Sequence, residues 1–263
     1  MPRANRHFIP GHIWHITHRC HKQDFLLKFA KDRRNWIHWL FEAKKRYGLC
    51  VLNYIVTSNH IHLLVADTGD NCIPKSMQLI ASRCAQTYNR RKQRKGAYWE
   101  DRYHATAIEN NEHMIRCLVY IDLNMVRAGV VQHPSQWLFG GYTEIQNPPV
   151  RKRIIDIERL MKLCGADETE EFQKAHCDWV ESKINNNDLS REAKWSESVA
   201  VGDLVYVEYV QEQLKLVARG RESIPIGDAY QLKERVAAYN THLTPKKPQL
   251  SLENSYCWDD NVY

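Results

Sequence analysis

The segment TSNHIHLL, residues 57–64, carries two histidines separated by a single isoleucine. Residues i and i+2 of a β-strand point to the same face, so His60 and His62 would stand side by side in a strand. Ile61 and Leu63 would then point to the opposite face. Two neighbouring imidazoles can bind a metal ion, or they can be polar residues on a solvent-facing side of the strand. The pair alone leaves both interpretations open.

A second group of chemically useful residues lies in EHMIRCLVYIDLNMVRAG, residues 112–129. A metal site that handles phosphate needs several protein ligands and open positions for substrate oxygens. Asn124 offers an amide oxygen, and Tyr120 lies one helical turn earlier, on the same side. A phenol beside a phosphate polarised by a metal ion can attack the phosphorus atom. Taken by itself, Tyr120 could equally be a half-buried structural tyrosine.

The helix expected over residues 112–129 has two unlike faces. Its apolar stripe consists of Met114, Leu118, Ile121 and Met125. The stripe offset from it by two residues consists of Arg116, Tyr120, Asn124 and Arg127. An offset of two residues is about 200° around a helix, so the two stripes lie on opposite sides. The polar stripe lacks the Glu and Lys that are usual on a surface helix.

Strands and helices alternate before this segment. Hydrophobic periodicity predicts strands at 12–20, 50–57, 61–67 and 103–109, and helices at 32–47 and 75–94. Gly48 and Gly96 are the expected ends of the two helices. The order βαββαβ predicts an α+β fold of the ferredoxin-like or RRM-like kind, with an antiparallel sheet and two helices on one face.

The remainder of the chain is expected to form a separate extension. QNPPVRKR, residues 146–153, has the composition of a linker after a domain at residues 1–145. Residues 154–263 are predicted to be mainly helical, and the last 20 residues to form a poorly ordered tail. The predicted helices of the extension span 154–164, 170–184 and 204–218.

Composition places the protein among globular chains with a real core. Of its 263 residues 43% are hydrophobic and 10% aromatic. It has no run of eighteen apolar residues and no apolar stretch near the N-terminus, so we expect a soluble intracellular protein. The eight cysteines are scattered without a CxxC pair, which argues against a zinc ribbon and for reduced thiols.

Positive charge is concentrated in the first part of the chain. Residues 1–150 hold 21 Lys and Arg against 11 Asp and Glu, which favours a polyanionic partner for this part. RRKQRK, residues 90–95, lies between Tyr88 and the Tyr98-Trp99 pair. Cations beside aromatic rings suit single-stranded nucleic acid, although basic residues at a helix end also complement the helix dipole. The candidate DNA-binding residues are Arg19, Arg90, Arg91, Lys92, Arg94, Lys95, Trp99, Arg116 and Arg127.

NHIHLL followed downstream by VYIDLNMVRAGVV resembles the REP-associated tyrosine transposases, a branch of the HUH single-strand DNA endonucleases. IPGHIWHITHRC is similar to the opening strand of that family, YWEDRYHATAI to its fourth-strand region, and SQWLFGGY to its closing segment. The resemblance covers about residues 1–145. An HxH pair alone is weak, but HxH, Tyr-x3-Asn and VRAG in this order are specific.

The resemblance implies a role for each candidate. His60 and His62 would bind Mg²⁺ or Mn²⁺, Asn124 would be the third ligand, and Tyr120 would be the nucleophile of a third, catalytic helix. Attack would leave a 5′-phosphotyrosine and free a 3′-OH. The implied partner is a single-stranded REP-type hairpin with a nearby guide tetranucleotide. The implied protein is cytoplasmic, associated with the bacterial nucleoid, and a monomer or homodimer.

Two positions depart from the family pattern. Ser58 and Met125 stand where the family usually has proline, which concerns the rigidity of the hairpin and the end of the helix. Two other functions stay open on the residues alone. One is a non-catalytic binder of REP-like DNA or of a structured RNA hairpin, for which the nucleophile would be superfluous. The other is a metallohydrolase that uses water, for which Asp67 and Asp70 would have to supply carboxylates.

Overall fold

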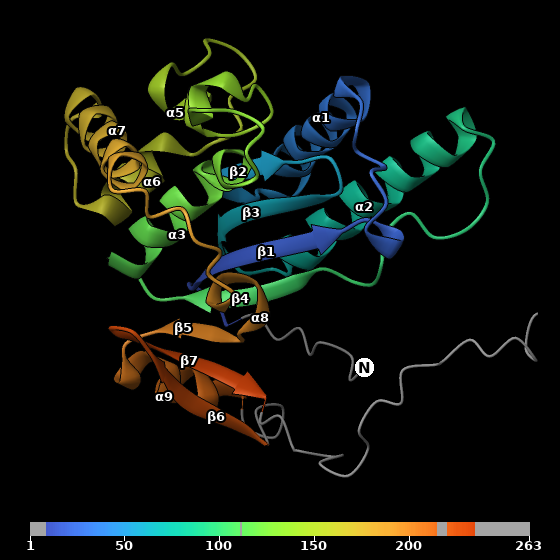
Figure 1. Ribbon diagram of the computed structural model, residues 1–263. Coiled ribbons are helices and arrows are strands. Elements are labelled where there is room, and N and C mark those ends of the chain that lie inside the picture. The colour runs from blue at the N-terminus through green and yellow to red at the C-terminus, as the bar shows by residue number, and fades with distance from the viewer. Residues whose placement is uncertain (1–8, 111, 215–219, 235–263) are drawn as a thin grey trace, which may run out of the picture.

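The computed structural model describes residues 9–110, 112–214 and 220–234. Its strands form one seven-stranded sheet in the order β2-β3-β1-β4-β5-β7-β6 (Figure 1). Neighbouring strands are antiparallel except β4 and β5, which are parallel. The strands are β1 (Ile13–Arg19), β2 (Cys50–Val56), β3 (His60–Ala66), β4 (His104–Ile108), β5 (Ala200–Gly202), β6 (Arg221–Ile226) and β7 (Ala229–Glu234).

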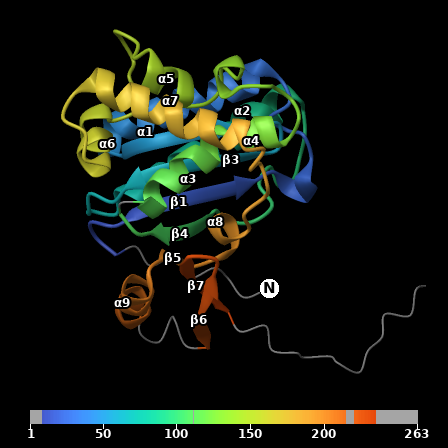
Figure 2. The ribbon, with the colours of Figure 1, turned by 60° about the vertical axis from the view of Figure 1, so that its left-hand side comes forward.

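Helices lie on both faces of this sheet. The helices α1 and α2 cover one face, and α3 lies across the other (Figures 1 and 2). The helices are α1 (Ala30–Tyr47), α2 (Cys72–Arg91), α3 (Glu112–Asp122), α4 (Asn124–Arg127), α5 (Tyr142–Gln146), α6 (Ile157–Cys164), α7 (Thr169–Asn185), α8 (Lys194–Glu197) and α9 (Leu204–Leu214). Two short 3-10 helices are η1 (His21–Gln23) and η2 (Pro134–Gln136).

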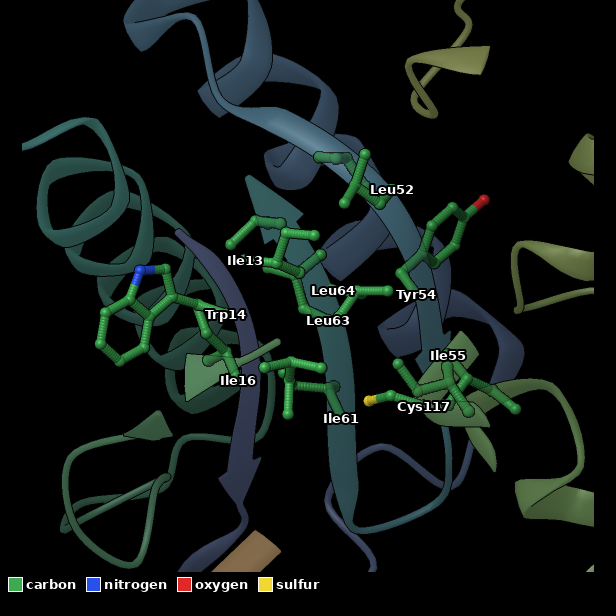
Figure 3. Close-up of a cluster of buried hydrophobic side chains, with 14 of the residues drawn as sticks. Ile13, Trp14, Ile16, Leu52, Tyr54, Ile55, Ile61, Leu63, Leu64 and Cys117 are labelled. Atoms are coloured by element: carbon green, nitrogen blue, oxygen red, sulfur yellow. The ribbon is translucent and has the colours of Figure 1, made fainter. Parts of the chain in front are cut away.

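The predicted βαββαβ core is confirmed as the β2-β3-β1-β4 half of the sheet with α1 and α2. Its hydrophobic residues alternate along the strands, so one row faces the two helices. Ile16 of β1 lies opposite Leu63 of β3, and neither side chain is exposed (Figure 3). Complete burial of such a side chain contributes about 1.5–3 kcal/mol. Gly48 ends α1 in the left-handed conformation, φ 68°, as its position in the sequence predicts.

The third helix is not continuous over residues 112–129 as predicted. It divides into α3 and α4 at Leu123, where ψ is 1°. The N–H of Leu123 still donates to the carbonyl of Val119 at 3.0 Å, so the chain direction is kept. Leu123 is buried in a small cluster with Val119, Val126 and Val180 of α7. Packing against α7 therefore accompanies the local departure from helical geometry.

A buried polar network also joins α3 to α7. His176 Nε2 lies 2.9 Å from Oδ2 of Asp122, and Asn53 donates to Oδ1 of the same carboxylate at 3.0 Å. His176 and Asp122 are almost completely buried. Since Asp122 follows Tyr120 by two residues, this network fixes the part of α3 that carries the candidate nucleophile.

The extension is mainly helical, as predicted, but it also continues the sheet. Helices α6, α7 and α9 confirm the three predicted helices with shifted bounds. The strands β5, β6 and β7 and the short helix α8 were not predicted. Ala200 and Val201 of β5 pair in parallel with Ala107 and Ile108 of β4. Trp195 of α8 is fully buried in the main hydrophobic core, so the extension shares that core.

Some predictions fall partly or wholly outside the described residues. The predicted tail is one of them, and so is the last part of the helix predicted over 204–218. The seven cysteines in the described residues are free thiols, in agreement with the sequence prediction, and Cys257 lies outside them.

Candidate active site

The two histidines of β3 lie on the sheet face that α3 covers. Across the ladder to β1, His60 pairs with Arg19 and His62 pairs with Thr17. Ile61, between the two histidines, is completely buried on the opposite face. The alternation that the sequence predicts for this segment is therefore present in the strand.

Tyr120 and Asn124 meet His62 from the helical layer. Nδ2 of Asn124 donates to Nε2 of His62 at 3.0 Å. The rings of Tyr120 and His62 are nearly perpendicular, at 82°, with centroids 5.9 Å apart. The His60 and His62 ring centroids are 5.0 Å apart. The tyrosine and asparagine of the third helix are thus docked on the same side of the sheet as the paired imidazoles.

These four residues line one cavity of about 360 Å³. Its lining is formed by Arg19, Gln23, Asn59, His60, His62, Tyr120, Asn124, Arg127, Ala128, Arg191 and Ser196. A second cavity of about 560 Å³ is also lined by Tyr120 and Arg127, together with residues of α7 and of the segment before α8. Tyr120 and Arg127 therefore stand between the two cavities.

Arg127 holds Tyr120 from two directions. Its guanidinium lies 3.9 Å from the centre of the phenol ring, and its Nη2 donates to the backbone carbonyl of Tyr120 at 2.7 Å. Burial raises the pKa of Tyr120, and the positive charge of Arg127 opposes that rise. The phenol is therefore protonated at neutral pH, with one cation beside it that favours the phenolate.

The two histidines of β3 are neutral. Burial, with smaller contributions from Arg19, Arg127 and Arg191, lowers the pKa of His60 to about 4. Burial lowers the pKa of His62 well below its ordinary value, and the neighbouring histidines act in the same direction. Neutral imidazoles keep a lone pair for a metal ion, so the environment favours the ligand form at neutral pH.

The donor atoms are compatible with a divalent metal ion. Nδ1 of His60 donates to Oδ1 of Asn59 at 2.7 Å, which leaves the lone pair on Nε2. No group of three or more His, Cys, Asp or Glu side chains in the described part of the chain could hold a metal ion. The third protein ligand would therefore be the amide of Asn124, turned so that Oδ1 faces His62. Two imidazoles and one amide leave positions for phosphate oxygens, as Mg²⁺ or Mn²⁺ chemistry requires.

Lowering the pH is expected to destabilise the metal-free protein between about pH 6.5 and pH 4. The unfolded chain takes up a proton at His60 near its ordinary pKa of about 6.5, whereas the folded protein does so only near 4. The unfolded state therefore binds more protons in this window, and the free energy of unfolding falls as pH falls. Urea unfolding across the window measures this. In a His60→Asn variant the free energy of unfolding should fall less steeply as the pH is lowered. A fall as steep as that of the wild type would contradict the lowered pKa of His60.

The carboxylates that a water-using metallohydrolase would need lie elsewhere. Asp67 follows the end of β3 that is remote from His60, and Asp70 lies three residues further on. Neither residue lines the cavity. The arrangement therefore does not support a metallohydrolase that draws on these two residues.

The structure distributes the predicted DNA-binding residues over three places. Arg19 and Arg127 line the cavity of the histidines. Arg116 lines the second cavity, where it forms ion pairs with Glu112 and Asp228. The basic residues Arg90, Arg91, Lys92, Arg94 and Lys95 lie at and beyond the end of α2 and line neither cavity.

Several residues around the end of α2 already have partners within the protein. Arg91 pairs with Asp32 of α1, and Arg94 donates to the carbonyl of Ala97 at 2.8 Å. The ring of Trp99 stacks on His18 at 4.0 Å, and its indole N–H donates to a backbone carbonyl of α2. The Trp99 ring face against His18 is therefore not available for stacking on a base.

Sequence reasoning missed several residues of the cavity wall. Asn59 adjoins the paired histidines in the sequence, and its position beside His60 could have indicated a supporting role. Gln23 comes from η1, and the extension supplies Arg191 and Ser196. Nothing in the sequence pattern connects the latter two with the histidine pair, because more than a hundred residues separate them.

Comparison with known proteins places the site in a family context. Residues 10–124 match the family model described as "Transposase IS200 like", and all four candidate residues fall within the matched segment. Residues 10–124 are therefore similar to IS200-like transposases, in agreement with the resemblance to REP-associated tyrosine transposases drawn from the sequence motifs.

Two solved structures are similar to the chain. One is a REP-associated tyrosine transposase bound to a REP hairpin, with 20% identity and a TM-score of 0.47, covering 55% of this chain and 84% of that one. The other is a candidate transposase from Deinococcus radiodurans R1, with 15% identity and a TM-score of 0.34, covering 48% of this chain and 95% of that one. No match was found among curated proteins. None of the helices in the described residues is both long and apolar enough to cross a membrane.

Proposed function

We propose that the protein is a metal-dependent single-strand DNA endonuclease and strand transferase that acts on REP-like hairpin DNA through a 5′-phosphotyrosine intermediate. The observation that supports this most directly is the meeting of Tyr120, Asn124, His60 and His62 at one cavity inside a transposase-like domain. The histidines come from the sheet and the other two residues from the helical layer, so the fold itself creates the constellation.

The chain's own residues supply positioning, charge and the nucleophile. A bound divalent ion would offset the charge that develops on the non-bridging phosphate oxygens. The phenol oxygen of Tyr120 attacks the phosphorus atom, an O–P bond to the tyrosine forms, and the bond to the 3′ oxygen breaks. The proton of the phenol is in effect transferred to the departing 3′ oxygen. The Arg127 guanidinium lies over the Tyr120 ring and stabilises the negative charge that develops on the phenol oxygen as it attacks.

The positive charge around the cavity is suited to a single strand. Arg19, Arg127 and Arg191 line the cavity and can neutralise backbone phosphates on either side of the scissile bond. The specific substrate, a REP-like hairpin with a nearby guide tetranucleotide, follows from the motif resemblance and is part of the proposal. So are a cytoplasmic location at the bacterial nucleoid and a monomeric or homodimeric state.

The experiment that tests the proposal is incubation of the full-length protein with end-labelled single-stranded hairpin DNA and Mg²⁺ or Mn²⁺, followed by a denaturing gel. We expect a protein–DNA adduct that resists denaturation and a cleaved strand with a free 3′-OH. The alternative function, a non-catalytic binder of REP-like DNA or structured RNA, would give a complex on a native gel and no adduct. Binding without an adduct under every metal condition would decide for that alternative.

Arg191 is expected to contribute one phosphate contact. Its side chain is 63% exposed and lines the cavity from the extension. Arg191→Ala should therefore weaken binding of hairpin DNA and make the plot of log affinity against log salt less steep by about 1. Arg46→Ala is the matched control, because Arg46 lies on α1, on the other face of the sheet. If both variants keep the wild-type slope, the strand does not pass Arg191.

A further inference from the structure

We propose that His15 is a positioning residue that holds His62 in the tautomer with its lone pair facing the cavity, and that the backbone carbonyl of Trp195 sets this tautomer from the extension. The proposal rests on the proposed function in one respect, since it takes His62 as a metal ligand. Two members of the chain of contacts, His15 and Trp195, are not assigned to the site by the sequence motifs.

Three hydrogen bonds in series connect the extension with the cavity. Nδ1 of His15 lies 2.6 Å from the carbonyl oxygen of Trp195. Nε2 of His15 lies 2.9 Å from Nδ1 of His62. Nε2 of His62 lies 3.0 Å from Nδ2 of Asn124 at the cavity. The two imidazoles are parallel to within 7°, with ring centroids 5.0 Å apart.

The position of every proton in this series follows from its first member. A carbonyl oxygen can only accept, so Nδ1 of His15 carries a proton. A neutral imidazole has one N–H, so Nε2 of His15 is an acceptor and Nδ1 of His62 must donate to it. Nε2 of His62 is then left with a lone pair. In the metal-free protein the amide N–H of Asn124 donates to that same atom, in agreement with a lone pair there.

Burial excludes the water molecules that would otherwise compete for these hydrogen bonds. His15 is completely buried and His62 is 4% exposed, so little water reaches their ring nitrogens. The ring partners of His15 are a backbone carbonyl and a second imidazole, and neither of them is a carboxylate that would stabilise a positive charge on the ring. The full burial of the Trp195 side chain in the main core holds its backbone carbonyl in place.

The consequence for the site is chemical. A neutral imidazole is free to place its proton on either nitrogen, and a proton on Nε2 of His62 would face the cavity where a cation has to bind. Partners behind a ligating histidine orient the ring and raise its basicity, and their loss commonly weakens metal binding about 10–100-fold. Trp195 lies outside residues 10–124, so the extension acts on a histidine pair that belongs to the matched segment.

The test begins with the metal-free wild-type protein, because the tautomer does not depend on activity. Nitrogen-15 NMR of the histidine rings should show His62 protonated on Nδ1 and unprotonated on Nε2. A His62 ring protonated on Nε2 would overturn the proposal without any variant. This measurement stays informative if the protein forms no DNA adduct. Failure of the proposed positioning by His15 and failure of the proposed function can therefore be told apart.

Two variants test the role of His15. His15→Leu should shift His62 toward the other tautomer and weaken Mn²⁺ binding, measured by calorimetry, about 10–100-fold. His15→Gln keeps an acceptor near the position of Nε2 and should restore the tautomer and most of the Mn²⁺ affinity. His18→Leu is the matched control, since His18 is a buried histidine of the same strand that faces the other side of the sheet.

Two outcomes would contradict the proposal. One is an unchanged His62 tautomer and unchanged Mn²⁺ affinity in His15→Leu. The other is an equal loss of Mn²⁺ affinity in His18→Leu, which would mean that the effect is only structural. If the leucine variant does not fold, His15→Gln decides the question. Retention of the proton on Nδ1 of His62 supports the positioning role of His15, and loss of that proton refutes it.

Discussion

Tyr120→Phe is expected to abolish the covalent protein–DNA adduct and to reduce strand cleavage by at least about 1000-fold, the scale on which loss of a nucleophile acts. The substitution removes one oxygen atom and keeps the ring that packs against His62 and Arg127. Binding of hairpin DNA should stay close to that of the wild type, because the phosphate contacts come from the arginines. Adduct formation on denaturing gels and binding on native gels measure the two quantities separately.

The matched control is Tyr142→Phe. Tyr142 is equally buried, but it lies on α5 and its hydroxyl contacts Cys177 rather than the cavity. This variant should form the adduct at the wild-type rate. Cleavage by Tyr120→Phe at the wild-type rate would show that the phenol is not the nucleophile and would remove the central step of the proposed function.

His62→Ala is expected to remove the response of cleavage to Mg²⁺ and Mn²⁺. Its Nε2 faces Asn124 at the cavity, so the variant loses one of the two imidazole ligands that the site can offer. We expect Mn²⁺ affinity to fall by more than about 100-fold, beyond the range seen when only a supporting partner is lost. Calorimetric titration of Mn²⁺ and adduct formation at increasing metal concentration measure this effect. His60→Ala should behave in the same way.

His104→Ala provides the comparison for both variants. His104 lies on the same sheet but does not line the cavity. Its Nε2 lies 2.8 Å from the carbonyl oxygen of Ser198. It should leave Mn²⁺ binding unchanged. Adduct formation by the wild-type protein that persists in EDTA would count against the metal site itself, whatever the variants do.

Much of the core could be predicted because its signals are local. The alternation around His60 and His62 specifies a strand with two imidazoles on one side, and Gly48 specifies the end of α1. The apolar stripe with Met114, Leu118 and Ile121 specifies which side of the third helix is buried. Each of these signals depends on side-chain periodicity within a few residues, which the sequence displays directly.

The parts that could not be predicted depend on contacts between distant segments. β5 has only three residues, Ala200–Gly202, too few for a periodic pattern, and it exists because β4 offers a strand to pair with. The bond from His15 to Trp195 joins residues 180 positions apart. The division of the third helix occurs at Leu123, which packs against Val180 of α7, a residue far along the chain. None of these contacts is indicated by a local pattern in the sequence.

The parallel pairing of β5 with β4 has a consequence for self-association. In a bare βαββαβ unit, β4 is an outer strand with unpaired backbone groups, and a second copy could add to the sheet there. In this protein β5 pairs with that edge of β4, and β7 and β6 continue the sheet beyond it. The strand β6, which contains Pro225, is therefore the edge strand on this side. A dimer that exchanges DNA strands would therefore have to be built through some surface other than the flank of β4.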